Sequence, residues 1–318
     1  MMSPADPILD YGAFRRYRVP VRVAREVCDR HGLPRPKRIV RLKRGEVNAL
    51  FRLDFDQKNP LICKIWVRPS GPEVMELHVS TVSRIHRETG VPTPRWLCIS
   101  SGDDLIPYPY VVLEYIDGED GDVLWRTLSV EQKQRLLAEC AQIMLILHTS
   151  GIEAPGPTDA SAWAATEIDR HRRCIQALRQ QGWFNGRTLE RVECAWDRRA
   201  ASLSNAGQLS LVHYDFQLHN LRVDPASLKV LSVLDFDYVT QAPPFTDARD
   251  LVLGVFLRDP GLADTFWQEY GVLDEGQQKI LALHSLGRLL DILAAYGGPT
   301  PFGWDAGMAA PLLDQLDV

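Results

Sequence analysis

The sequence predicts an α+β protein with two lobes, an antiparallel sheet and one helix in the first and mainly helices in the second. The chain has 318 residues, which is long for one compact core and suits two domains. Short apolar segments bounded by turn residues occur between residues 38 and 113, whereas helical periodicity dominates after residue 129. We place the N-terminal lobe at residues 1–113, the C-terminal lobe at 114–318, and their connection at about 113–118.

The first lobe is predicted from three strands and a helix. Residues 38–55 form an apolar strand, a turn from Gly45 to Asn48 and a second strand, and LICKIWV (61–67) predicts the third. Lys64 stands among apolar neighbours on this third strand, although lysine is rarely buried unless it is paired. A lysine at a strand edge whose amine reaches water is the structural alternative. The next segment, 72–90, has one apolar face and ends at Gly90, as a helix does.

The second lobe begins after a buried strand. YPYVVLEYIDGEDG (108–121) predicts a strand that runs into a turn at Asp117-Gly118. Residues 129–151 predict a helix with Ser129 as its N-cap and Gly151 as its stop. Residues 160–202 predict two helices that are interrupted at 181–187, and 251–257 predicts an apolar core segment.

The segment LVHYDFQLHNLRVDPASLKVLSVLDFDY (211–238) carries the strongest functional signal. LSLVHYD and VLSVLDFD predict short buried strands that end in polar residues, so Asp215 lies on a loop and Asp235 at a strand end. Phosphoryl transfer from a nucleotide needs one carboxylate for the acceptor hydroxyl, and an amide oxygen and a second carboxylate for Mg²⁺. Asp215, Asn220 and Asp235 supply these three groups.

Two other interpretations of this segment stay open. His213, Asp215, His219 and Asp235 include the side chains that a metal-dependent hydrolase uses to hold its metal. A polar turn with no chemical role is the second interpretation.

The spacing HxDxxxxN, followed about fifteen residues later by aspartate, resembles the aminoglycoside phosphotransferase-like kinases, relatives of choline kinase, type II homoserine kinase and macrolide phosphotransferase. GVPTP (90–94) resembles another element of this family, and the resemblance extends from about residue 38 to about 255. It implies a two-lobed protein-kinase-like fold. It also implies a Mg²⁺-dependent enzyme that uses ATP or GTP to phosphorylate a hydroxyl of a small molecule.

The resemblance implies roles for named residues. Asp215 is expected to be the catalytic base or orienter, and His213 to brace its loop. Asn220 and Asp235 are expected to hold Mg²⁺, with Asp237 assisting the metal or bracing the loop. The expected nucleotide-binding residues are Lys64, its helix partner Glu76 (Glu73 as second choice), the loop residues Gly45 and Asn48, and the hinge residues Glu114, Tyr115 and Ile116. Asp250 is expected to orient the catalytic loop, and His148 to be structural.

Two rival functions share these residues. A kinase of a protein target needs the same catalytic set, and only its acceptor distinguishes it. A nucleotide-binding module without catalysis is the other rival, although the complete set Lys64, Asp215, Asn220 and Asp235 argues against it.

Composition and charge complete the sequence-based expectations. The chain is 45% apolar and 24% charged, with no membrane-length apolar run, no signal-peptide pattern and no CxxC spacing, so we expect a cytoplasmic protein with reduced thiols. Residues 1–44 hold twelve Lys/Arg and four Asp/Glu, which suggests either a solvated basic face or a polyanion site; we expect no nucleic acid partner. Residues 251–318 hold nine Asp/Glu and three Lys/Arg, which indicates either a pocket for a cationic acceptor such as an aminoglycoside or scattered surface acids.

Overall fold

The computed structural model describes residues 17–42, 48–66, 72–182, 184–297, 300 and 303–317, with side chains in α3 described from Glu76 onward. The chain divides into two compact units. The first comprises residues 1–87 and 92–117, and the second comprises residues 88–91 and 118–318. Within the described ranges, no helix has both the length and the apolarity that a membrane crossing requires.

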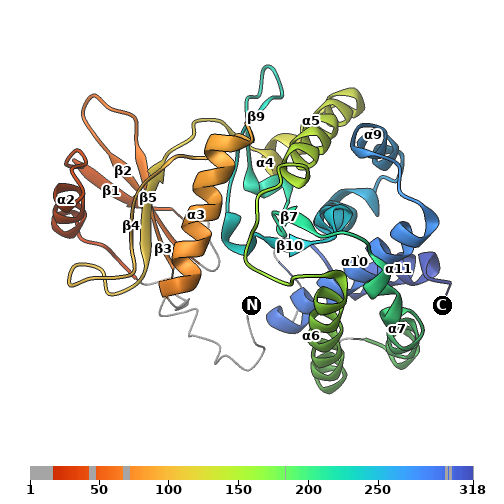
Figure 1. The fold of residues 1–318 in the computed structure, drawn as a ribbon. Coiled ribbons are helices and arrows are strands. Elements are labelled where there is room, and N and C mark those ends of the chain that lie inside the picture. Colours follow the sequence, from red (N-terminus) through yellow and green to blue (C-terminus); the bar gives the residue numbers. More distant parts are fainter. Residues whose placement is uncertain are drawn as a thin grey trace. The chain divides into compact units, whose positions relative to one another are not determined.

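The first unit is built on a five-stranded antiparallel sheet (Figure 1). Its strands are β1 (Arg38–Arg41), β2 (Asn48–Asp54), β3 (Leu61–Trp66), β4 (Trp96–Ser100) and β5 (Tyr110–Glu114), in the spatial order β1-β2-β3-β5-β4. The strand β3 therefore lies in the centre, where Lys64 is opposite Leu50 of β2 and Val111 of β5. The helix α3 (Pro72–Glu88) lies beside the sheet.

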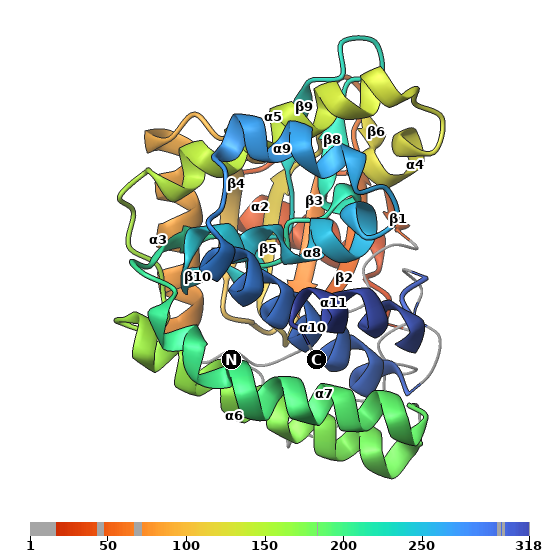
Figure 2. The same ribbon diagram turned by 90° about the vertical axis from the view of Figure 1, so that its right-hand side faces the viewer.

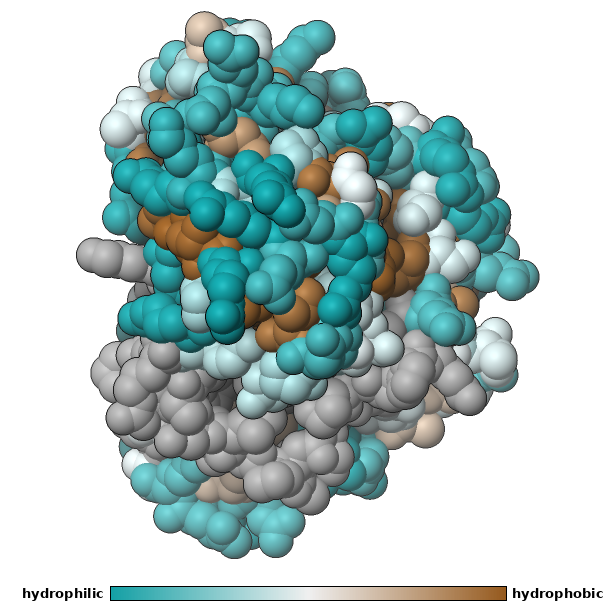
Figure 3. All heavy atoms as spheres, turned by 90° about the vertical axis from the view of Figure 1, so that its left-hand side faces the viewer, coloured by the Kyte–Doolittle hydropathy of each residue, from teal (hydrophilic) through white to brown (hydrophobic). Residues whose placement is uncertain are grey.

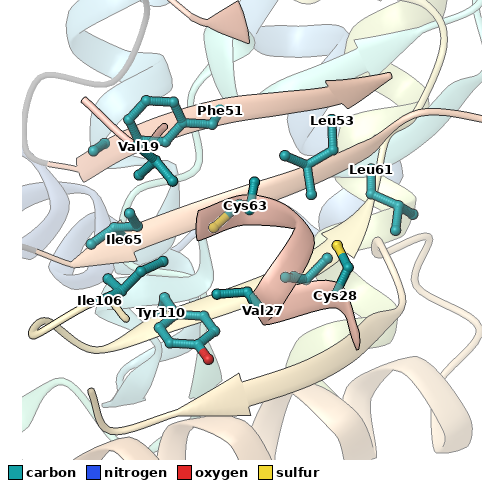
Figure 4. Close-up of a cluster of buried hydrophobic side chains, with 13 residues drawn as sticks. Val19, Val27, Cys28, Phe51, Leu53, Leu61, Cys63, Ile65, Ile106 and Tyr110 are labelled. Carbon is teal, nitrogen blue, oxygen red and sulfur yellow. The ribbon is translucent and has the colours of Figure 1, made fainter. Parts of the chain in front are cut away.

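A helix covers one face of this sheet. The helix α2 (Val21–Arg30) directs Val27 and Cys28 onto Phe51, Leu53 and the other apolar side chains of that face (Figure 4). Alternation along β2 explains the arrangement, because its buried residues fall on every second position from Ala49 to Leu53. The remaining apolar side chains form a second cluster, which is made of Ile62, Val111 and Leu113 with Leu42, Leu50, Trp66, Trp96, Ile99 and Tyr115 around them.

Among residues 17–42, most of the basic side chains of the N-terminal region are paired with acids. Arg30 contacts Asp103 and Asp104, and Lys37 contacts Asp56 at 2.7 Å. Arg35 and Arg38 likewise pair with Asp29 and Asp54. Figure 3 shows this side of the molecule as mostly hydrophilic, with small apolar islands. The arrangement fits the solvated-face interpretation of the sequence.

The second unit is mainly helical. Its longer helices are α5 (Val130–His148), α6 (Ala160–Gln181), α7 (Gly186–Arg199), α9 (Gly261–Tyr270) and α10 (Glu275–Tyr296), and its shorter ones are α4 (Gly121–Trp125), α8 (Arg249–Leu251) and α11 (Ala309–Gln315). The helix α5 packs on α9, and α10 packs on α6 and α11 (Figure 2). The predicted Ser129 cap is confirmed, because its hydroxyl accepts from the Gln132 amide in a capping box.

Two small sheets and several single turns of helix carry the catalytic segment. One sheet pairs β7 (Ser210–Val212) with β10 (Thr240–Ala242), and the other has the order β6 (Glu119–Asp120), β8 (Leu221–Val223), β9 (Val230–Val233). The 3₁₀ turns are η1 (Ala200–Asn205), η2 (Leu218–Asn220), η3 (Phe236–Tyr238), η4 (Pro244–Ala248) and η6 (Ala306–Met308), and η5 (Val252–Phe256) is a short π-helix. The predicted break between α6 and α7 and the buried core segment after residue 250 are both confirmed.

Candidate active site

The loop between β7 and β8 brings the predicted catalytic residues together. The strand β7 ends at Val212, and η2 carries Asn220 back towards the second sheet. His213, Asp215 and Asn220 are all buried. Asp235 follows the end of β9, as expected, and its backbone has the left-handed conformation, with φ of 63°.

The carboxylate of Asp215 is held on both oxygens. Its Oδ1 accepts hydrogen bonds from Gln217 Nε2 at 2.7 Å and from Arg288 Nη2 at 2.7 Å. Its Oδ2 accepts from Asn220 Nδ2 at 3.0 Å. Burial raises the pKa of Asp215, the Arg288 guanidinium opposes this rise, and the carboxylates of Asp250 and Asp235 add to it.

His213 braces the loop through both ring nitrogens. Its Nε2 lies 2.9 Å from the Leu234 carbonyl oxygen, and its Nδ1 accepts from the Asp215 backbone amide at 3.3 Å. These two bonds together require the neutral tautomer with the proton on Nε2. With both nitrogens occupied, His213 is not available as a metal ligand. Across the described part of the chain, no group of three or more His, Cys, Asp or Glu side chains is arranged to hold a metal ion.

Asp247, which the sequence analysis did not name, supports the backbone of the catalytic loop directly. Asp247 is fully buried, and its carboxylate accepts the backbone amides of His213 at 2.8 Å and Tyr214 at 2.6 Å. His148 Nε2 lies 3.1 Å from the same carboxylate, which gives His148 the expected structural role. Burial alone would raise the pKa of Asp247, but the hydrogen bonds from His148 and the His213 amide hold it below its ordinary value.

Asp250 contacts arginines rather than the loop backbone. It accepts from Arg288 Nε at 2.9 Å and from Arg249 Nε at 3.3 Å. Asp250 was expected from the family resemblance, and sequence reasoning missed Asp247, which lies three residues earlier, in η4. It also missed Gln217 and Arg288, which no local pattern marks.

Tyr214 fixes the turn between His213 and Asp215. It has a φ of 66°, a region that a bulky residue adopts only where other contacts enforce it. Its hydroxyl donates to Glu167 Oε1 at 2.8 Å, and its carbonyl oxygen accepts from Arg249 Nη2 at 2.6 Å. The Arg249 guanidinium also lies 3.8 Å from the centre of the tyrosine ring. The catalytic loop is thereby tied to α6 and α8.

A buried ionic cluster of α6 and α10 supports this tie. Glu167 accepts from Arg170 at 2.5 Å, and Arg170 also pairs with Asp291 at 3.1 Å. His284 Nε2 faces Arg249 Nη1 at 2.9 Å, so burial and this neighbouring charge lower the pKa of His284 well below its ordinary value. His171 completes the cluster, and its ring lies so close to Gly287 that no β-carbon fits there.

The predicted metal ligands come from η2 and from the residues that follow β9. Asp235 and Asp237 are both partly exposed and flank the buried Phe236. The Nδ2 atom of Asn220 is used by Asp215, which leaves its amide oxygen as the atom for a metal. Carboxylate and amide oxygens are the donors that Mg²⁺ prefers, so these residues fit the ion.

The first unit holds the predicted nucleotide-binding residues. Lys64 is buried, and its Nζ lies 5.6 Å from the centre of the Trp66 ring. Asn48 is buried opposite Trp66, at the start of β2. Glu76 is exposed on α3 and makes no ion pair within the described residues, so its pairing with Lys64 stays a prediction. Gly45 and the Glu73 side chain lie outside the described residues.

The predicted hinge residues follow β5. Glu114 pairs with Arg95 at 3.1 Å, and Tyr115 lies under the guanidinium of Arg52 at 5.0 Å. The Tyr115 amide donates to the Pro60 carbonyl oxygen at 3.4 Å. Within the described ranges, no hydrogen bond engages the backbone of Ile116.

At least five of the nine acidic residues of 251–318 are engaged within the chain. Asp274 and Asp305 cap α10 and η6, Asp291 is in the buried cluster, and Asp314 pairs with Arg191 at 2.6 Å. Asp317 pairs with Lys279 and Arg199. These five acids therefore fit the interpretation of dispersed acids better than that of one acidic pocket.

The comparisons with known proteins agree with this geometry. The model of the phosphotransferase enzyme family matches residues 38–283. A ternary complex of aminoglycoside phosphotransferase APH(4)-Ia with ADP and hygromycin B has a TM-score of 0.67 and 15% identity, covering 92% of this chain and 98% of that one. The complex of APH(2″)-IIa with gentamicin has a TM-score of 0.63 and 16% identity, covering 94% of this chain and 96% of that one.

A curated relative is much longer than this chain. Acyl-CoA dehydrogenase family member 10 of Mus musculus is 22% identical over 232 residues, which are 70% of this chain and 21% of the relative. The chain thus spans about a fifth of that relative's length. The structural likenesses confirm the predicted protein-kinase-like α+β fold. The family match covers most of the chain, and the chain belongs to the phosphotransferase enzyme family.

Proposed function

We propose that the chain transfers the γ-phosphoryl group of ATP or GTP, with Mg²⁺, to a hydroxyl group of a small molecule. The observation that carries this proposal is the catalytic loop, in which a buried Asp215 is fixed by three donors beside the metal-type ligands Asn220 and Asp235. Membership of the phosphotransferase enzyme family supports the reaction class.

Each residue has a separate task in the proposed reaction. Asp215 accepts or orients the proton of the acceptor hydroxyl, and His213 holds the loop in place. Asn220 and Asp235 hold Mg²⁺ with help from Asp237, and the bound ion neutralises negative charge on the phosphates. Asp235 already raises the pKa of Asp215, and a divalent cation offsets such repulsion between neighbouring carboxylates.

The nucleotide is proposed to bind the first unit. Lys64 contacts the phosphates, Glu76 positions Lys64, and Gly45 and Asn48 belong to the phosphate-binding loop. The backbone of Glu114, Tyr115 and Ile116 faces the base of the nucleotide. The ADP in the APH(4)-Ia complex supports a nucleotide co-substrate.

Two classes of acceptor follow from the findings. The structural relatives bind hygromycin B and gentamicin, so aminoglycosides are the first class. The curated relative is named an acyl-CoA dehydrogenase, and only about a fifth of it matches this chain. A hydroxyl-bearing acyl compound is therefore the second class, and it does not need an acidic pocket.

The decisive experiment is a nucleotide-turnover assay over an acceptor panel. The panel contains aminoglycosides, macrolides, choline, homoserine, hydroxyacyl thioesters and a mixed protein substrate, each with ATP and with GTP. Acceptor-dependent release of diphosphate with a small molecule supports the proposal. Phosphorylation of protein alone would identify a protein kinase instead.

Paired measurements on variants test the assigned roles. Asp215→Asn should reduce turnover by about 10²–10⁴-fold while nucleotide affinity stays near that of the parent. Asn220→Ala should also raise the Mg²⁺ concentration needed for half-maximal rate. Loss of nucleotide binding in Asp215→Asn would show that Asp215 is a ligand and not the base.

Thermal unfolding separates binding from catalysis. ATP or GTP should raise the Tm only when Mg²⁺ is present, because a ligand stabilises the state that binds it. Asp235→Ala should abolish this Mg²⁺-dependent part. Binding without turnover on any acceptor would favour the non-catalytic module.

A further inference from the structure

Arg288 links the catalytic loop to the long helix α10. It lies 73 residues after Asp215 in the sequence, and its side chain is 17% exposed. Its guanidinium donates from Nη2 to Asp215 Oδ1 at 2.7 Å and from Nε to Asp250 Oδ1 at 2.9 Å. Two nitrogens of one planar group thus hold two carboxylates, an arrangement that a lysine cannot reproduce.

The guanidinium is itself fixed by its surroundings. Asp250 is buried and also accepts from Arg249, which in turn donates to the Tyr214 carbonyl oxygen at 2.6 Å. Burial opposes the charge on Arg288, but the carboxylates of Asp250 and Asp215 raise its pKa above the ordinary value. Arg288 therefore stays a cation in one orientation.

The hydrogen bonds distinguish the two oxygens of Asp215. A carboxylate has about four lone-pair sites, two on each oxygen. Both sites of Oδ1 are occupied, by Arg288 and by Gln217. Oδ2 has one partner, Asn220 Nδ2 at 3.0 Å, and so keeps one site for a further proton donor.

We infer that Arg288 is a positioning residue for phosphoryl transfer, which holds Oδ1 of Asp215 and thereby leaves Oδ2 to receive the proton of the acceptor hydroxyl. This inference rests on the proposed function. In the step, the hydroxyl gives its proton to Oδ2 while its oxygen forms a bond to the γ-phosphorus. The bond from that phosphorus to the bridging oxygen breaks, its electron pair leaves with the nucleoside diphosphate, and Asp215 later releases the proton to water.

The inference makes Arg288 act through Asp215 and not on the nucleotide. Arg288→Gln should lower kcat by about 10–100-fold, as small misplacements of catalytic groups do. The dissociation constant of the Mg²⁺-nucleotide complex should stay near that of the parent. Arg288→Lys keeps the charge but reaches only one carboxylate at a time, so its kcat should lie between those of the parent and Arg288→Gln.

A double-mutant cycle that combines Asp215→Asn with Arg288→Gln, with kcat as the readout, tests whether Arg288 positions Asp215 or has only a general structural role. Once Asp215→Asn has removed the base, adding Arg288→Gln should change kcat little, because residues that act as a unit are not additive. The matched control is Arg173→Gln, which removes an exposed ion pair with Asp169 on α6 and should leave kcat unchanged. The small molecule that is phosphorylated in the acceptor panel serves as substrate throughout.

The outcomes are distinguishable. If Arg288→Gln does not fold, as judged by its thermal unfolding, the same cycle is measured with Arg288→Lys. The inference about Arg288 is overturned if the losses of kcat in the two single variants add in full in the double variant. It is also overturned if Arg288→Gln weakens nucleotide affinity and leaves kcat unchanged. If the parent itself transfers no phosphate to any acceptor, the proposed function has failed, and that result is independent of Arg288.

Discussion

Replacing Asp247 by asparagine removes the negative charge that supports the catalytic loop. It also puts an NH₂ group, a hydrogen-bond donor, in the place of one carboxylate oxygen, which is an acceptor. Oδ2 of Asp247 accepts from the His213 amide and faces His148, while Oδ1 accepts from the Tyr214 amide at 2.6 Å. The best fit for asparagine keeps its oxygen at the Oδ2 position. Its NH₂ group then faces the Tyr214 N–H, and a buried donor loses its acceptor.

The magnitude follows from these contacts. A buried donor left without a partner costs about 1–3 kcal/mol. The hydrogen bonds to the His213 amide and to His148 survive, but they become weaker because the acceptor is no longer charged. Charge-assisted hydrogen bonds are roughly twice as strong as neutral ones. We expect a total loss of about 3 kcal/mol in the free energy of unfolding, which corresponds to a Tm lower by about 6–12 °C.

The assay is thermal unfolding by circular dichroism, together with turnover at a temperature at which both proteins are folded. Asp259→Asn is the control, because Asp259 is an exposed carboxylate and its change should stay within about 0.5 kcal/mol. Turnover of Asp247→Asn should also fall, since Tyr214 and Asp215 share the loop that Asp247 supports. A Tm within a degree of the parent with unchanged turnover would refute the reasoning.

Three further predictions concern other parts of the chain. Lys64→Ala should slow phosphoryl transfer by about 10²–10³-fold, because it removes a cation aimed at the phosphates. The control Lys58→Ala lies on an exposed turn and should leave the rate unchanged. Equal steady-state rates for Lys64→Ala and the parent would refute the assignment of Lys64. Gly287→Ala should destabilise by about 1–3 kcal/mol in urea unfolding, because its β-carbon would lie 2.3 Å from the His171 ring, while Gly254→Ala has open space and should be tolerated. His284 has a lowered pKa in the folded protein, so its stabilising contribution is complete above about pH 6.5 and is lost as the pH falls below that value. The Tm measured between pH 8 and pH 5 should therefore decrease on the acid side, and a His284→Gln protein with the same slope would contradict this.

The fold of the catalytic segment could be predicted because its signals are local. Asp215 and Asn220 are five residues apart on one loop, and Asp235 follows an apolar run that is long enough for only one short strand. Strand length and turn residues therefore determine where these side chains lie. The same holds for Lys64, because a single charge in an apolar strand stands out against its neighbours.

Two other assignments needed more than local patterns. Asp247 and Asp250 are acids only three residues apart, and no local pattern distinguishes the one that contacts the loop backbone. Both prove to be buried. The choice depends on which carboxylate meets the backbone amides of a loop more than thirty residues earlier in the chain. Likewise, the composition of residues 251–318 shows an excess of acids but not what each acid contacts. Which acids form helix caps and which form ion pairs depends on the partners that the fold brings next to them.

The sequence by itself predicted the family motif, many of the strands and helices, and the identity of the proposed base and metal ligands, but it did not predict α2, β4 or the helices α9 to α11. Tertiary structure alone decided how the base is held. Arg288 reaches Asp215 from 73 residues away, and Glu167 reaches the Tyr214 hydroxyl from 47 residues away. Periodicity and turn chemistry act over a few residues, whereas such contacts depend on the packing of α6 and α10 around the loop, which brings distant side chains within hydrogen-bonding distance.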